Sequence, residues 1–371
     1  MNARTYLVGG YVRDLLLSKH GIPATPSDKD FVVVGATPEY MAERGFIPVG
    51  ADFPVFLHPK THEEYALART ERKTAPGYHG FVFSASPDVT LEDDLRRRDL
   101  TINAIAMDEE GNLFDPWGGE RDIIRRVFRH VSEAFREDPV RILRLARFSA
   151  RLPEFSIDPG TWELVCGMVQ RGEADALVPE RVLKEIARGI MERRPSRMME
   201  VLVDSGAWAR IAPDSRCDRD TLDALDRAAE HGSPLPVRFE ILMESAGSRA
   251  PDLARSLRAG TDAVGLAQTA VRATPLMESS KGPDDMVRVL EAADAFRRPE
   301  RFEHLLETQE ILSGMDTGPW LAASRAARAT ATREAVKLAS TPKEIPLRIR
   351  EARTRAVEAA LRETRNGEKH G

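Results

Sequence analysis

The stretch Asp28-Lys29-Asp30-Phe31-Val32-Val33-Val34 decides how the first part of this 371-residue chain folds. Residues 31–34 are apolar and largely β-branched, so they predict a buried strand that ends at Gly35. Residues two apart on a strand point to the same face, which places Asp28 and Asp30 side by side at the mouth of this strand. Two neighbouring carboxylates repel each other unless a cation lies between them. The pair is therefore a candidate metal site.

A pair of glycines precedes this strand, in Val8-Gly9-Gly10-Tyr11-Val12-Arg13-Asp14. A strand over residues 6–8 ends at the glycines, and residues 11–17 have a helical pattern. A Gly-Gly turn into a helix lets backbone N–H groups approach a phosphate closely, and Arg13 adds a guanidinium. Phosphate cradle and carboxylate pair together predict a Mg²⁺-nucleotide site. Taken singly, each half also fits a simpler structure, solvated strand-end carboxylates or a plain turn.

The order Gly-Gly-x-Val-Arg-Asp followed by Asp-x-Asp resembles the signature of DNA-polymerase-β-type nucleotidyltransferases. It is most similar to class II tRNA nucleotidyltransferases (CCA-adding enzymes) and their bacterial poly(A) polymerase relatives. The resemblance implies an α+β fold: a polymerase-β-like head with a mixed sheet and helices, then an all-α neck, body and tail. The expected domains are a head at 1–118, a neck at 119–215 and a tRNA-binding body and tail at 216–371. Asp28 and Asp30 would hold catalytic Mg²⁺, and Gly10 and Arg13 would bind the triphosphate.

A second part of the resemblance lies in residues 91–106. Acidic residues come first and basic residues later over residues 91–99, which suits a helix and its dipole. Residues 97–104 match the family motif Arg-Arg-Asp-x-Thr-x-Asn-Ala, which implies that Arg98 contacts the nucleotide. Asp99 and Asn103 would hold the local structure. A third carboxylate could come from Glu63 or Glu64, although a solvated glutamate at a strand edge explains either one as well.

The stretch 137–148, Glu-Asp-Pro-Val-Arg-Ile-Leu-Arg-Leu-Ala-Arg-Phe, predicts a basic amphipathic helix. Asp138 is a good N-cap, and Pro139 suits the first helical position. Four arginines fall in a stripe roughly 120° wide, opposite an apolar face: Arg141, Arg144, Arg147 and Arg151. A solvated face would explain this pattern. However, few acids lie at (i, i+4) to neutralise the arginines, and this scarcity favours an anionic ligand.

This stretch also resembles the nucleobase-selecting motif of the family, Glu-Asp-x-x-Arg. The resemblance places Asp138 and Arg141 at the base edge, with Arg144 and Arg147 also on the nucleotide. Cytosine and adenine present an amino donor beside a ring-nitrogen acceptor, whereas uracil and guanine present a carbonyl beside an N–H. A carboxylate only accepts and a guanidinium only donates. Such a pair therefore selects C and A, and mismatched buried polar groups can discriminate by ~10⁴ or more.

Further elements follow from periodicity and from proline or glycine positions. We expect strands at 54–58, 64–68 and 112–116, a polar loop at 70–80, and helices at 38–44, 159–170, 179–193 and 195–205. The resemblance implies that the loop helps to switch specificity from C to A, and its full length favours complete CCA addition. No His-Asp dipeptide occurs in the chain, so we expect no phosphohydrolase centre.

Composition limits the compartment and the partners. The net charge is −5, but residues 121–151 contain nine Arg against four Asp or Glu, which suits a protein that binds RNA on one face. Cys166 and Cys217 stand far apart and suggest reduced thiols in a cytoplasmic protein. The sequence shows no apolar leader and no long apolar run, so we expect neither secretion nor a membrane span. We expect a monomer or a weak dimer.

These features predict template-independent addition of CCA to the 3′ end of tRNA, with CTP and ATP as substrates and Mg²⁺ as cofactor. The alternatives are a poly(A) polymerase and an enzyme that adds only A, because those relatives share most of the motifs. A non-catalytic RNA-binding protein is the third possibility, and it predicts loss of a metal carboxylate or of Arg13. None of these residues is lost.

Overall fold

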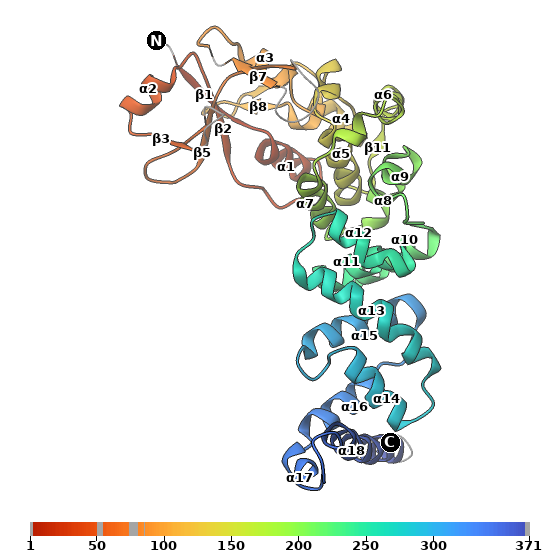
Figure 1. Cartoon of the computed structure of the whole chain (residues 1–371). Helices are drawn as coiled ribbons and strands as arrows, with labels where there is room; N and C mark the ends of the chain where they lie inside the picture. The colour runs from red at the N-terminus through yellow and green to blue at the C-terminus, as the bar shows by residue number, and fades with distance from the viewer. Residues whose placement is uncertain (1–2, 50–54, 74–80, 85, 368–371) are drawn as a thin grey trace. The chain divides into compact units, whose positions relative to one another are not determined.

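A computed structural model describes residues 3–49, 55–73, 81–84 and 86–367 (Figure 1). The chain forms two compact units, Met1–Arg181 with Asp204–Ile211, and Val182–Val203 with Ala212–Gly371. The first unit contains the strands and the second is helical. The division into domains at residues 118 and 215 stays a prediction. Among the described helices, none combines the length and the apolar character that crossing a membrane requires.

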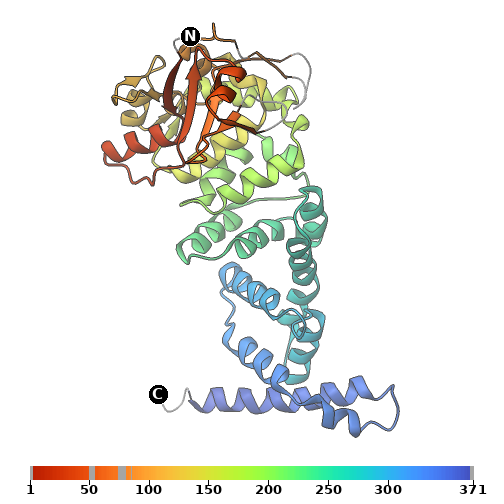
Figure 2. The same ribbon diagram turned by 90° about the vertical axis from the view of Figure 1, so that its left-hand side faces the viewer.

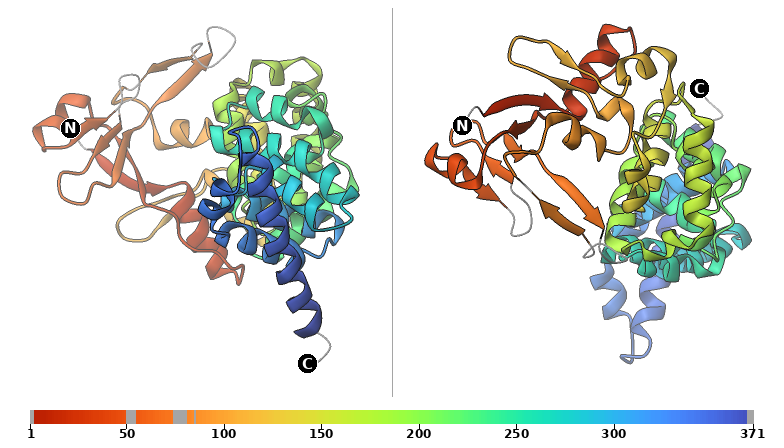
Figure 3. Two further views of the ribbon diagram at one scale, coloured as in Figure 1. Left: turned by 60° about the horizontal axis from the view of Figure 1, so that its bottom comes forward. Right: turned by 90° about the horizontal axis from the view of Figure 1, so that it is seen from above.

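The first unit is built on a seven-stranded mixed sheet with the order β3-β4-β5-β2-β1-β8-β9. Strand β2 pairs antiparallel with β1 and parallel with β5, as the red and orange strands of Figure 3 show. The bounds are β1 Arg4–Val8, β2 Asp30–Val34, β3 Ile47–Val49, β4 Val55–Leu57, β5 Glu64–Leu67, β8 Ala106–Met107 and β9 Leu113–Phe114. The predicted mixed sheet is confirmed, and β3 and β8 were not expected from the sequence.

The alternation along β2 decides which face carries the site. Val33 packs with Met41 and Phe56 in one apolar cluster, while Val32 packs on the other face with Leu95 in a second cluster. Asp30 is two residues before Val32 and shares its face. Leu95 belongs to helix α3 (Leu91–Arg96). Helix α3 therefore packs on the face of the sheet that carries Val32 and Asp30.

Helices cover this sheet and continue the first unit. They are α1 Gly10–Lys19, α2 Pro38–Glu43, α3, α4 Gly119–Arg125, α5 Val140–Arg151, α6 Pro159–Gln170 and α9 Ala207–Ile211. The predicted bounds of α6 are confirmed. Helix α5 begins one residue later than predicted, because Pro139 rather than Asp138 is its N-cap. Helix α3 ends at Arg96, and a 3₁₀ turn, Thr101–Asn103, follows it.

The prediction of a loop from residue 70 is wrong for the first four residues. Thr70–Lys73 is strand β6, and it pairs antiparallel with β7, Phe81–Ser84. Residues 74–80 lie outside the described part of the chain. The strand escaped detection because its residues are polar and do not alternate, and because its pairing partner lies beyond the Gly- and Pro-containing segment.

The second unit is helical throughout its described residues, as predicted. Its helices are α8 Pro195–Asp204, α10 Arg219–Glu230, α11 Leu235–Glu244, α12 Ala250–Ser256, α13 Thr261–Ser279, α14 Pro283–Ala292, α15 Pro299–Ser313, α16 Gly318–Ala329, α17 Thr332–Lys337 and α18 Ile345–Gly367. Helix α7, Pro179–Gly189, carries the boundary between the units and ends four residues before the predicted 193. Figure 2 shows α18 as one long helix. Cys166 and Cys217 are free thiols.

Helix α11 contains a buried carboxyl group that destabilises the second unit. Glu240 is 0% exposed, and neither carboxylate oxygen has a hydrogen-bond partner in the described structure. Burial, and then the neighbouring Glu244, raises the pKa of Glu240 well above its usual value. The folded state thus binds this proton more tightly than the unfolded state does, so stability falls as pH rises above the ordinary glutamate pKa of about 4.3.

We therefore expect Glu240→Leu to raise the thermal unfolding temperature, with a larger gain at pH 8 than at pH 5. Removing an unpaired buried polar group is worth about 1–3 kcal/mol, which is several degrees for a unit of this size. Thermal unfolding of both proteins at the two pH values measures this. Glu230→Leu, at an exposed position of α10, is the control. An equal gain at both pH values would show that Glu240 is not the titrating group.

Candidate active site

Three carboxylates lie at the sheet end where β2 begins. Asp30 opens β2, Asp28 precedes it by two residues, and both are exposed. Glu64, the first residue of β5, lies opposite Asp30 in the parallel register. Although the residue as a whole is exposed, partial desolvation of its carboxyl group raises the pKa of Asp30. The neighbouring Glu64 raises this pKa further, and Arg98 lowers it. Glu63 instead accepts a hydrogen bond from Thr61 at 2.7 Å, so Glu64 is the better placed of the two for a third carboxylate.

The donor set of this sheet end fits Mg²⁺ bound together with a nucleotide. In the described residues, no three His, Cys, Asp or Glu side chains form a ready metal cage. A closed cage is not needed, because Mg²⁺ is usually held by one or two carboxylates, several waters and the phosphates of its substrate. Asp28 and Asp30 supply hard oxygen donors of this kind at an exposed position.

The glycine pair permits a close approach between three segments. Gly9 has φ +70°, and a Cβ on it would lie 3.2 Å from Nη1 of Arg98. A Cβ on Gly10 would collide with the side chain of Ser27, next to Asp28. The turn therefore brings the N-terminus of α1, the segment before β2 and Arg98 together, as the prediction of a phosphate cradle requires.

Arg98 lies at the wall of this cleft. Its Nη2 donates to Oδ2 of buried Asp94 at 3.1 Å, and its Nε has no partner in the described residues. Burial alone would raise the pKa of Asp94, but Arg98 and Arg97 lower it below its usual value. Arg98 also lines a cavity of about 250 Å³ together with Asp30 and Glu64. The structure thus brings Arg98 to the carboxylates, and its contact with the nucleotide stays a prediction.

Arg13 is placed differently from the other predicted phosphate ligands. It is only 4% exposed, its Nε donates to Asp14 at 2.8 Å, and its Nη1 donates to Asn103 at 2.7 Å. These bonds tie α1 to the 3₁₀ turn. Its contact with the triphosphate stays a prediction. In the structure, Arg13 connects the helix that follows the glycine turn to Asn103 of the 3₁₀ turn.

Asp99 connects the head to helix α5. It accepts hydrogen bonds from Asn103 at 3.0 Å and from Nε of Arg144 at 2.7 Å. Burial alone would raise the pKa of Asp99, but Arg144, the Asn103 amide and Arg141 hold it well below its usual value. The expectation that Asp99 and Asn103 hold local structure agrees with these contacts. Asp99 therefore connects the segment that carries Arg98 to the arginines of α5.

Two more arginines of α5 are partly enclosed by the protein. Arg141 is 8% exposed, and it donates to the carbonyl oxygens of Ala134 at 2.8 Å and Arg97 at 2.7 Å. Arg147 is also 8% exposed, with its Cζ 4.7 Å from the ring centroid of Phe148. The arginine stripe predicted from periodicity exists, but carboxylates and backbone carbonyl oxygens outside α5 accept hydrogen bonds from its guanidinium groups. The (i, i+4) spacing could not reveal them.

Asp138 has a partner that the sequence did not reveal. Nη1 and Nη2 of Arg181 donate to its two carboxylate oxygens at 3.1 and 2.7 Å, and the backbone N–H of Val140 donates to Oδ1 at 3.0 Å. Arg181 comes from α7, 43 residues further along the chain. No local pattern in the sequence could connect the two side chains.

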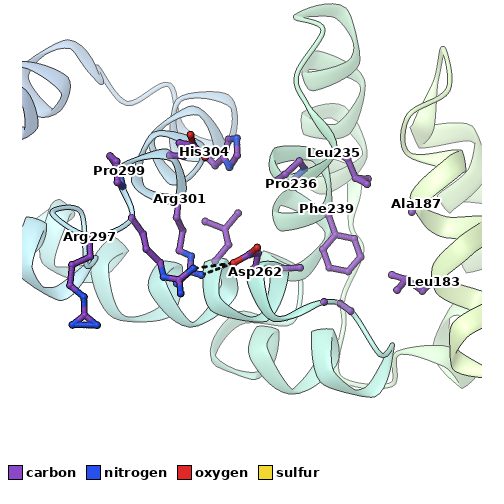
Figure 4. Close-up of a pocket in the computed structure, with 16 residues that line it drawn as sticks. Leu183, Ala187, Leu235, Pro236, Phe239, Asp262, Arg297, Pro299, Arg301 and His304 are labelled. Atoms are coloured by element: carbon purple, nitrogen blue, oxygen red, sulfur yellow. Dashed lines mark hydrogen bonds and ion pairs between the residues drawn. The ribbon is translucent and has the colours of Figure 1, made fainter.

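The second unit has a cavity of its own, of about 680 Å³. Figure 4 shows an apolar wall with Leu183, Leu235 and Phe239, and a charged wall where Arg301 contacts Asp262. None of the residues predicted for catalysis lines it. The smaller cleft beside Asp30 is the candidate active site, because only it combines metal-type carboxylates with a glycine turn.

Comparisons with known proteins identify relatives of this chain. Residues 5–129 match the family model described as the Poly A polymerase head domain. The chain is 51% identical over 358 residues to a CCA-adding enzyme of Bordetella pertussis, covering 96% of this chain and 97% of that protein. It is 46% identical over 406 residues to a Multifunctional CCA protein of Azoarcus sp., covering 96% of this chain and 97% of that protein.

Solved structures share the fold. The Bacillus stearothermophilus CCA-adding enzyme in complex with CTP superposes with a TM-score of 0.68 at 23% identity, covering all of this chain and 95% of that chain. The Thermotoga maritima CCA-adding enzyme complexed with tRNA has a TM-score of 0.66 at 21% identity, covering 96% of this chain and 88% of that one. The predicted polymerase-β-like head with a helical remainder is therefore confirmed as the fold.

Proposed function

The chain belongs to the family of CCA-adding enzymes, and from that premise we propose that it adds CMP, CMP and AMP without a template to the 3′ end of tRNA. It is a tRNA nucleotidyltransferase with nucleotide and tRNA substrates. One observation carries the proposal: Arg98 and Asp30 line the same cavity, and the segment 97–99 is bonded to Arg141 and Arg144 of α5. The carboxylates proposed to bind metal and the helix proposed to select the base are thus connected through residues 97–99.

Asp28 and Asp30, with Glu64 beside them, would hold Mg²⁺. When bound, Mg²⁺ lowers the pKa of the attacking 3′-hydroxyl and offsets the charge of the triphosphate. The glycine turn offers backbone N–H groups to the phosphates. Arg98 adds a guanidinium from the other side of the cleft, where it favours negative charge on the phosphate oxygens. Arg144 and Arg147 extend this cationic wall along α5.

Asp138 and Arg141 would read the base. A carboxylate receives the exocyclic amino group of cytosine or adenine, and a guanidinium donates to the ring nitrogen beside it. Uracil and guanine would leave these polar groups unpaired, at a cost that supports discrimination. One pair of side chains can therefore serve both CTP and ATP. The basic helical surface beyond the neck would hold tRNA through its shape and phosphates.

An extension assay tests the function. The full chain is incubated with Mg²⁺, a tRNA that lacks its last three nucleotides, and CTP and ATP singly and together. We expect growth by three nucleotides with both substrates and by two with CTP alone. Long A-only tails would favour a poly(A) polymerase, and one A added only to tRNA ending in CC would favour an A-adding enzyme. No extension of any substrate would contradict all three.

The other properties of the protein follow from this role. A cytoplasmic location suits an enzyme that acts on tRNA, and the free thiols agree with a reducing compartment. We expect a monomer or weak dimer in solution. The chain has no His-Asp dipeptide, so we propose that it lacks phosphohydrolase activity even though similar proteins carry the name Multifunctional CCA protein.

A further inference from the structure

The carboxylate of Asp138 is held on two sides before any base arrives. Arg181 forms a bidentate pair with it, at 3.1 Å to Oδ1 and 2.7 Å to Oδ2. The N–H of Val140 donates to Oδ1 at 3.0 Å. Arg181 lies in the first turn of α7, and Val140 begins α5, so two separate helices determine the orientation of this one carboxylate.

These contacts leave a specific accepting position. An ionised carboxylate has about four acceptor positions, two on each oxygen. Oδ1 uses both of its positions, on Val140 and on Arg181, and Oδ2 uses one on Arg181. The position that remains is on Oδ2. The carboxylate of Asp138 is 23% exposed, so it can receive one further donor at this oxygen, which matches a single exocyclic amino N–H.

We propose that Arg181 is the positioning residue for base selection: it locks Asp138 so that Oδ2 presents one acceptor to the amino group of cytosine or adenine. The inference rests on the proposed function of Asp138 as a base reader. A carboxylate free to rotate could move to accept the ring N–H of uracil, and then the two bases would differ little. The planar fork of arginine is suited to this task, and the point charge of lysine is not.

The experiment measures the ratio of kcat/KM for CTP to that for UTP, with tRNA lacking CCA as the primer. We expect Arg181→Gln to lower this ratio by about 10²-fold, the size of effect that a small misplacement of a binding group produces. The KM for CTP should rise more than kcat falls, and Arg181→Lys should restore only part of the ratio. Arg171→Gln is the matched control, because Arg171 forms an exposed pair with Glu173 in the same unit.

A double-mutant cycle separates the two levels of the proposal. In an Asp138→Ala background, Arg181→Gln should lower the ratio no further, because the residue on which Arg181 acts is gone. If Asp138→Ala alone leaves the ratio unchanged, the base-reading assignment fails. If Asp138→Ala lowers the ratio but Arg181→Gln only lowers the unfolding temperature and slows all nucleotides equally, then Arg181 is merely structural and this inference is overturned.

Discussion

Asp28→Ala should reduce nucleotide incorporation by roughly 10³-fold while the affinity for tRNA hardly changes. A metal ion supplies several kcal/mol of transition-state stabilisation, and each ~1.4 kcal/mol is a factor of ten in rate. Asp28 is exposed and precedes Asp30 by two residues, so its loss removes a proposed metal ligand without opening a cavity in the core. RNA binding depends on cationic surfaces, to which this carboxylate contributes nothing favourable.

Single-turnover addition of CMP at saturating tRNA measures the first effect, and a filter-binding titration measures the second. Asp88→Ala is the matched control, since Asp88 is an exposed carboxylate that accepts a hydrogen bond from the nearby Ser86. Glu64→Gln should give a smaller loss than Asp28→Ala, because Glu64 lies opposite Asp30 but is proposed only to assist the aspartate pair. A fully active Asp28→Ala protein would remove the metal assignment.

Asp99→Ala should destabilise the first unit by about 1–3 kcal/mol, the usual cost of removing a buried acceptor from its hydrogen-bond donors; Arg144 is 37% exposed, so water reduces the cost of its lost ion pair. Asp99 is 6% exposed and bonds Arg144 and Asn103. Its loss leaves the Arg144 guanidinium without this partner, so α5 keeps only the bond from Arg141 to the carbonyl oxygen of Arg97 among the two described bonds to this segment. We therefore expect incorporation to fall as well, with a higher KM for both CTP and ATP.

The pH dependence gives an independent test of Asp99. Its pKa is lower in the folded state than in the unfolded state, so the folded state binds fewer protons. The stabilisation is fully present above the unfolded pKa of about 3.9 and is lost as pH falls below it. Asp99→Asn should therefore unfold with a shallower dependence on pH below about 4 than the unchanged protein. Asp88→Asn should keep the original slope, and equal slopes in all three proteins would contradict the ion-pair role.

Much of the fold was accessible from local patterns. The valine-rich strand, the glycine turn, the helix 159–170 and the helical second half all follow from periodicity and from Gly and Pro positions, and the structure confirms them. The misses share one cause. Strand β6, Thr70–Lys73, and the short β3 and β8 are each defined by pairing with another strand, the next one along the chain for β3 and β6 and the distant β1 for β8, and such pairing leaves little signal in the strand itself.

The site divides in the same way. The types of residue and their order along the chain already determined the strand that Asp30 opens and the arginine stripe of α5, because side-chain direction follows from the period of a strand or a helix; Asp28 lies before the strand, so this period does not fix its direction. Only the tertiary structure decided that Glu64 lies opposite Asp30, that Arg13 is bonded inside the head, and that Arg181 holds Asp138. These contacts join residues that are 34 to 90 positions apart, and the geometry of packed elements, which no local spacing contains, brings them together.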